Sequence, residues 1–111
     1  MPEPPVLRRW KHSQPPSDDT LNEALQVEGL EPHWWENGPG DKYETHSHDY
    51  HKVLFCASGT ITFTLHPTGE RLLLGAGDRL DLPAGWVHEA RVGPNGVRCV
   101  EGWREVPRAG L

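Results

Sequence analysis

Two histidines separated by a single residue impose the strongest local constraint on this chain. His46 and His48 lie in the stretch GDKYETHSHDYHKVLFCASG, residues 40–59. Side chains alternate between the faces of a β-strand, so residues two apart point the same way. Neutral imidazole is the commonest protein ligand for transition metals. The pair therefore predicts a strand that carries two metal ligands on one face.

A third candidate ligand, His88, follows a Pro-Ala-Gly turn in the stretch GDRLDLPAGWVHEA. The first stretch reads glycine, five residues, H-x-H, three residues, Lys52, six residues and glycine. The second stretch reads glycine, five residues, P-x-G, two residues and His88. This pair of motifs resembles the two motifs that define the cupins, and the resemblance covers residues 40–92. It implies a small β-barrel of jelly-roll topology.

Composition agrees with one small β domain. A chain of 111 residues has room for a single core. Its 12 glycines and 11 prolines separate many short apolar runs, which is typical of all-β proteins with tight turns. We predict an all-β fold, a cupin jelly-roll β-barrel with a short N-terminal helix and an irregular N-terminal arm.

The chain divides into an arm and one domain. Residues 1–16 carry five prolines among charged residues, so they cannot hold a helix, and we expect a flexible or draped arm. Residues 17–111 form the single cupin domain.

A short helix is predicted at about residues 18–28, at the start of the domain. Ser17 or Asp18 can cap its first turn, and Gly29 supplies its end. We expect its two leucines to pack on the outside of the barrel.

The first barrel strand is predicted at residues 31–37 and the closing strand at residues 97–103. Alternation sends Trp34 and Trp35 to opposite faces of the first of these strands. Asp78 falls in a turn, where a short carboxylate side chain binds backbone N–H groups, and we expect it to do so here.

Lys52 is the largest departure from the cupin pattern. In the cupins that the chain resembles, this position is normally a glutamate that completes a set of three histidines and one carboxylate. A protonated ammonium group cannot bind a metal, and it repels a divalent cation. Lys52 and Cys56 share the strand phase of His46, whereas His51 falls on the opposite face.

Three arrangements of the site remain open. The three histidines of the motifs could hold the metal alone, with Lys52 turned aside to pair with a carboxylate such as Asp81 or Glu89. A β-bulge could instead turn His51 inward as a fourth metal ligand. In the third arrangement no metal binds, and the histidines line a polar pocket together with Lys52.

Charge and hydropathy exclude several classes of function. The formal net charge of −5 argues against phosphate-backbone binding, so we expect no nucleic-acid partner. No apolar run reaches the length of a membrane helix and the first residues show no apolar signal core, so we expect no membrane partner and a cytoplasmic location. Cys56 and Cys99 are too few for a disulfide framework.

The expected function follows from the resemblance and from Lys52. Cupins include metal-dependent dioxygenases, isomerases and decarboxylases as well as small-ligand-binding and sensor modules. We expect one divalent transition metal (iron, zinc, nickel, copper or manganese) on His46, His48 and His88. The cavity gains positive charge from Lys52, so we expect a small anionic ligand that Lys52 orients as a catalytic residue. The alternative is a non-catalytic module that binds a small ligand, with or without metal.

The outer face of the central strand is apolar at Val53, Phe55 and Ala57. A face of this kind needs a cover. We expect either the N-terminal arm or a second subunit to provide it, and the second case would make the protein a homodimer.

Overall fold

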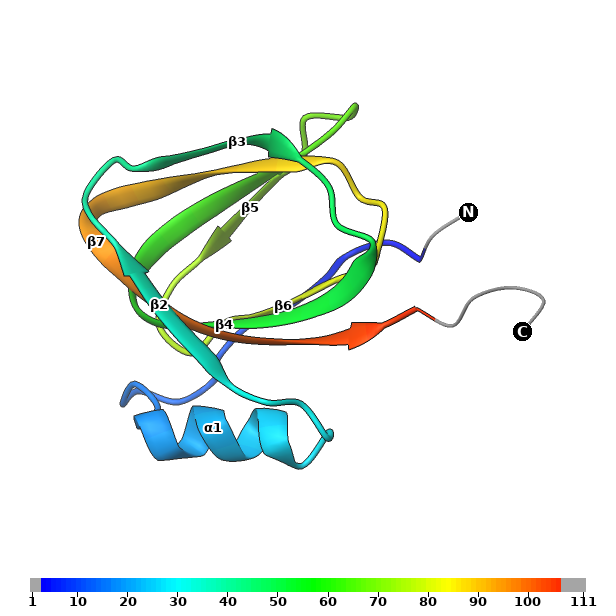
Figure 1. Ribbon diagram of the computed structural model, residues 1–111. Coiled ribbons are helices and arrows are strands. Elements are labelled where there is room, and N and C mark those ends of the chain that lie inside the picture. Colours follow the sequence, from blue (N-terminus) through cyan, green and yellow to red (C-terminus); the bar gives the residue numbers. More distant parts are fainter. Residues whose placement is uncertain (1–2, 107–111) are drawn as a thin grey trace.

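The computed structural model describes residues 3–106, which form one helix and seven strands (Figure 1). Residues 1–2 of the predicted arm and residues 107–111 of the predicted domain lie outside the described residues. The elements are β1 (Val6–Arg8), α1 (Asp18–Gln26), β2 (His33–Asn37), β3 (Lys42–His46), β4 (Tyr50–Leu65), β5 (Arg71–Leu74), β6 (Arg79–Leu82) and β7 (His88–Glu105). Strands dominate, which confirms the predicted all-β fold with a short helix. Among the described residues no helix has the length and apolar character needed to span a membrane.

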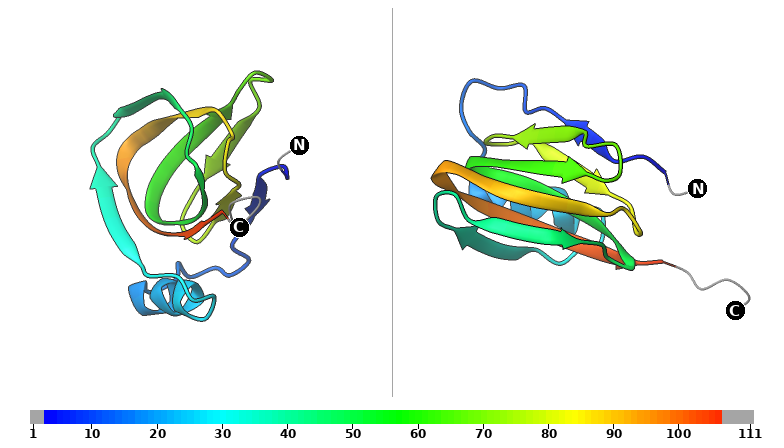
Figure 2. Two further views of the ribbon diagram at one scale, coloured as in Figure 1. Left: turned by 45° about the vertical axis from the view of Figure 1, so that its right-hand side comes forward. Right: turned by 90° about the horizontal axis from the view of Figure 1, so that it is seen from above.

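All strand pairs are antiparallel, and they form one sheet with the order β1-β6-β4-β7-β2. Two further strands join it, β3 beside β7 and β5 beside β4. The long strands β4 and β7 bend, so that the sheet curls around its inner face (Figure 2). The β4–β7 register shifts at two places, before and after Gly59, and bulges of this kind increase strand curvature. Gly59 has a φ of 74°, and a Cβ there would lie 1.9 Å from the Gly96 carbonyl oxygen, so only glycine fits.

The two faces of β4 pack into two separate apolar clusters. The interior cluster is built from alternate residues of β4 and its neighbours, among them Leu54, Cys56 and Ile61. The outer cluster contains the residues of opposite phase, Val53, Phe55 and Ala57. Alternation along the strand therefore separates the two faces as predicted.

Helix α1 covers the outer face of β4 (Figure 1). Its Leu21 and Leu25 are almost fully buried against that face. We expected the N-terminal arm or a second subunit as the cover, and this expectation is wrong for the described chain because the leucine face of α1 already occupies the site. The N-terminal cap is Ser17, whose hydroxyl accepts a hydrogen bond from the Thr20 N–H at 3.1 Å.

The N-terminal arm follows the edge of the sheet. Its short strand β1 pairs with β6, so that Val6 lies opposite Asp81. Farther along the arm, Trp10 packs against Gly77, where a Cβ would lie 2.2 Å from the indole. The arm is therefore attached at two points on β6 and the turn before it.

Asp78 fixes that turn and the arm together. Its carboxylate accepts hydrogen bonds from the backbone N–H groups of Gly75 and Trp10, both at 2.9 Å. The Arg9 guanidinium donates a third at 2.8 Å. Burial acts to raise the pKa of Asp78, but these three donors outweigh it and hold the pKa below its ordinary value. The predicted role of Asp78 in the turn is confirmed, and it extends to the arm.

We expect Asp78→Asn to lower the free energy of unfolding by about 1–3 kcal/mol at pH 7, because charged acceptors make the stronger hydrogen bonds. The carboxylate with a lowered pKa stabilises the fold above the unfolded value of 3.8 and loses this effect as pH falls through the folded value. The difference between wild type and variant should therefore shrink below about pH 4.

Urea denaturation at pH 7, 4 and 3 measures this difference. Asp49→Asn is the matched control, since Asp49 is exposed and its carboxylate makes no hydrogen bond within residues 3–106. Equal stabilities of the two variants at pH 7 would show that the Asp78 contacts contribute nothing.

Candidate metal centre

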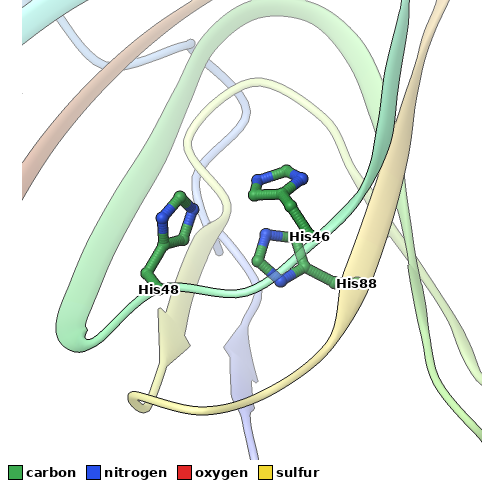
Figure 3. Close-up of side chains that lie close together, drawn as sticks. All are labelled: His46, His48 and His88. Atoms are coloured by element: carbon green, nitrogen blue, oxygen red, sulfur yellow. The ribbon is translucent and has the colours of Figure 1, made fainter.

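Three histidines converge inside the curled sheet (Figure 3). One potential ligand nitrogen from each of His46, His48 and His88 lies within 4.8 Å of the others. The ring centroids of His46 and His88 are 4.4 Å apart, and those of His46 and His48 are 4.7 Å apart. The structure thus brings together the three histidines of the two sequence motifs.

The strand pairing accounts for two of these positions. His46 ends β3 and His88 begins β7, and the two residues are directly opposite in the antiparallel register. His48 lies after the end of β3, in the connection to β4, so the prediction of two histidines on one strand is wrong in this detail. The His48 carbonyl accepts a hydrogen bond from the Gly85 N–H at 2.8 Å, which ties the connection to the turn before His88.

Backbone carbonyls orient two of the rings. The Nδ1 atom of His46 is 2.6 Å from the Glu44 carbonyl oxygen, and the Nδ1 atom of His88 is 2.8 Å from that of Trp86. A carbonyl oxygen only accepts, so each Nδ1 carries the proton and each Nε2 presents its lone pair. Metal-binding histidines in proteins are typically held by a second hydrogen bond of this kind.

The environment of the His48 ring favours a metal more than any other feature of the cluster. Its Nε2 is buried and has no hydrogen-bond partner among the described residues. Burial, followed by the charges of Lys52 and of the other two imidazoles, lowers the pKa of His48 to about 4. Burial also lowers the pKa of His88. Near neutral pH both rings are uncharged, and an orphaned imidazole nitrogen that faces two further imidazoles fits a divalent transition metal.

Lys52 has a partner that the sequence did not suggest. Its Nζ lies 3.4 Å from Oε2 of Glu101, and the side chains of both residues are little exposed, at 13% and 12%. The predicted partners are wrong, because Asp81 pairs with Arg79 at 2.6 Å and Glu89 accepts a hydrogen bond from Thr45. Asp81 lies opposite Val53 in the β4–β6 register, on the phase that faces away from the interior.

Glu101 is the site residue that the sequence analysis missed. It lies on β7 opposite Leu54, and its Oε1 accepts a hydrogen bond from the Trp35 Nε1–H at 2.7 Å. One signal was present: Glu101 is two residues from Cys99, which is fully buried, so alternation points its carboxylate inward.

Two other predicted residues lie apart from the cluster. The Nδ1 of His51 accepts a hydrogen bond from the Ala84 N–H at 3.0 Å, and His51 is not among the histidines that converge. Cys56 is fully buried in the interior core, directly opposite Cys99.

The histidine cluster borders a pocket of about 400 Å³. Lys52 and Glu101 line the same pocket, and its other walls are mainly apolar and aromatic. A volume in this range suits a small metabolite. The arrangement can therefore hold a metal and a small ligand side by side.

No protein-family model matches the chain, and no curated protein matches it. Solved structures do match it in fold. An RmlC-like cupin from Shewanella frigidimarina NCIMB 400 superposes with a TM-score of 0.60 at 20% identity, over 74% of this chain and 71% of that chain. A double-stranded β-helix protein from Klebsiella pneumoniae subsp. pneumoniae MGH 78578 matches with a TM-score of 0.58 at 25% identity, over 67% and 65%.

A third match comes from the crystal structures of the DMSP lyases RdDddP and RnDddQII. Its TM-score is 0.60 at 28% identity, and the match covers 74% of this chain and 40% of that chain. These likenesses confirm the fold that the motif spacing predicted. By its fold, the chain is a small protein of the cupin type.

Proposed function

We propose that the chain is a metal-binding cupin and a metal-dependent enzyme, with one divalent transition metal on His46, His48 and His88. The buried Nε2 of His48, which has no partner among the described residues and faces the other two rings, carries this proposal. The proposed substrate is a small anionic or oxygenated metabolite.

The donor set suits catalysis better than a purely structural site. Structural zinc sites use four protein ligands, whereas catalytic sites commonly use three and keep a position open. When bound, the metal would supply a Lewis acid at this end of the pocket. Three neutral imidazoles leave its positive charge uncompensated, which favours an anionic ligand.

Lys52 supports the same substrate class. An ammonium group has three N–H donors, and the ion pair with Glu101 at 3.4 Å occupies only one side of the Lys52 ammonium. Glu101 holds the ammonium in the wall of the pocket, and Trp35 in turn holds Glu101. Lys52 can therefore donate to an anionic group of the substrate and orient it.

The structural neighbours agree with an enzyme without choosing a reaction. One of them comes from the crystal structures of DMSP lyases. A shared fold shows that the scaffold can support catalysis, but the reaction depends on the residues of the individual site.

A non-catalytic ligand-binding module is the second candidate. The replacement of the cupin glutamate by Lys52 favours it, because an ammonium beside the histidines weakens metal binding. A module of this kind would bind its ligand without turnover, with or without a metal.

Metal content is the first test of the proposal. Protein purified without chelators or a histidine tag should contain about one equivalent of a transition metal, by elemental analysis. His46→Ala should lose this metal, because two imidazoles bind far more weakly than three. His66→Ala is the matched control, since His66 pairs with Glu89 outside the cluster and should leave the metal in place. No metal after reconstitution with iron, zinc, nickel, copper and manganese in turn would contradict the proposal.

Lys52→Glu tests the electrostatic role of the lysine. Replacing a cation by a carboxylate beside three imidazoles should raise metal affinity by roughly tenfold to a hundredfold. The metal-free variant should lose about 2–4 kcal/mol of stability, because the new carboxylate and Glu101 are then both buried without a cation.

A chelator competition measures the affinity, and urea denaturation with and without metal measures the stability. Lys42→Glu makes the same charge change at an exposed position and serves as the control. Equal metal affinities of the two variants would place the Lys52 ammonium away from the metal.

A further inference from the structure

Apolar side chains form much of the wall of the pocket beside the histidines. Leu54, Ile61, Phe63 and Ala90 line it from β4 and β7, and all four are at least 95% buried. Apolar surface of this kind binds the hydrophobic part of a ligand by removing it from water.

The aromatic walls add to this surface because their polar groups are already engaged. The Trp35 indole N–H donates to Glu101, and the Tyr43 hydroxyl donates to Asn37. Both rings line the pocket, and both have used their donors on the protein. A ligand that touches these walls meets carbon atoms and no free donor.

The polar groups of the pocket that keep capacity for a ligand are those of Lys52, its partner Glu101 and the histidines. Lys52 lines the pocket with three N–H donors, and its Nζ lies 3.4 Å from Oε2 of Glu101, so one donor faces that carboxylate and two remain for a ligand. Beside it, the Nε2 of His48 is unpartnered. The pocket therefore offers one polar end to a ligand whose remainder contacts apolar side chains.

We infer that the pocket takes a monocarboxylate with an apolar body, its carboxylate on Lys52 and its body against the walls of Leu54, Phe63 and Trp35. This inference deepens the proposed function and rests on its assignment of the pocket as the substrate site. A charge-assisted hydrogen bond fixes the carboxylate, and burial of the body supplies the remaining affinity.

The same walls select against sugar acids and other polyhydroxylated acids. Each hydroxyl group would give up hydrogen bonds to water and find no partner on the aliphatic and aromatic side chains. A hydroxyl group that is buried without a hydrogen-bond partner lowers the affinity of the ligand that carries it. The pocket should therefore bind an acid with an apolar body more tightly than an acid with a polyhydroxylated body, and this difference in affinity can be measured.

Titration of the full chain with phenylacetate, acetate and gluconate tests this inference, in both the metal-free and the zinc-loaded protein. Calorimetry gives the dissociation constants, and tryptophan fluorescence reports occupancy because Trp35 and Trp103 line the pocket. Phenylacetate should bind at least about tenfold more tightly than acetate or gluconate, because only its ring buries apolar surface. The preference should hold without zinc, since Lys52 and the walls are in place without it.

Two variants separate the polar end from the apolar body. Lys52→Met should weaken phenylacetate binding about tenfold or more, and Lys42→Met, an exposed control, should leave it unchanged. Trp103→Ala should weaken phenylacetate more than acetate. The Trp103 side chain is 40% exposed, so this second variant should fold even if the loss of Lys52 leaves Glu101 unpaired and unfolds the first.

Equal binding of gluconate and phenylacetate would overturn the inference, as would unchanged binding in Lys52→Met or equal losses of both acids in Trp103→Ala. The result is distinguishable from the metal test. A protein that takes one zinc but shows no preference among the acids contradicts only this inference. A protein that prefers phenylacetate but takes no metal contradicts only the proposed metal site.

Discussion

The ammonium group of Lys52 can lie inside the barrel only with a negative charge beside it, and Glu101 supplies that charge from the neighbouring strand. The β4–β7 register sets this partnership, and Trp35 fixes the orientation of the carboxylate. Desolvation of two charges offsets most of the attraction between them, so the pair adds little to stability. Its effect is on the pocket, where a cation occupies the position that a metal-binding glutamate takes in the cupins this chain resembles.

The same two strands connect this pair to the histidines. β7 begins at His88 and carries Glu101 near its other end, and β4 carries Lys52 alongside. Helix α1 packs against the outer face of both strands. Strand β4 bends at Gly59, where a larger residue would clash with the backbone of β7. The site is therefore held by long, packed elements, and only His48 lies on a connection between strands. Rigid support of this kind keeps ligating and charged groups in fixed positions.

Much of this arrangement could be predicted from the sequence, because it depends on local spacing. The intervals within the two motifs identified His46, His48 and His88, and alternation separated the two faces of β4. Strand alternation predicted that His46 and His48 share one face of a strand. The strand ends at His46, and the ring of His48 reaches the cluster from the connection that follows. Glu101 escaped prediction because its partnership with Lys52 depends on the register between strands far apart in the chain. The packing of the α1 leucines on the outside of the barrel was predicted from their spacing and is confirmed, but the particular strand face that they cover is a tertiary contact that no local pattern specifies.

The replacement of a carboxylate by Lys52 changes how metal and ligand affect one another. In a site with three imidazoles and a carboxylate, the protein itself neutralises part of the metal charge. Here the protein supplies neutral imidazoles and an ammonium that is paired with Glu101, so a metal bound to the histidines and Lys52 would repel each other, and an anion between them would relieve that repulsion. An anion that contacts both would then strengthen metal binding by the same factor by which the metal strengthens anion binding, since the linkage is reciprocal. Under the proposed function, the ligand would then supply beside the metal the negative charge that the cupin glutamate otherwise provides.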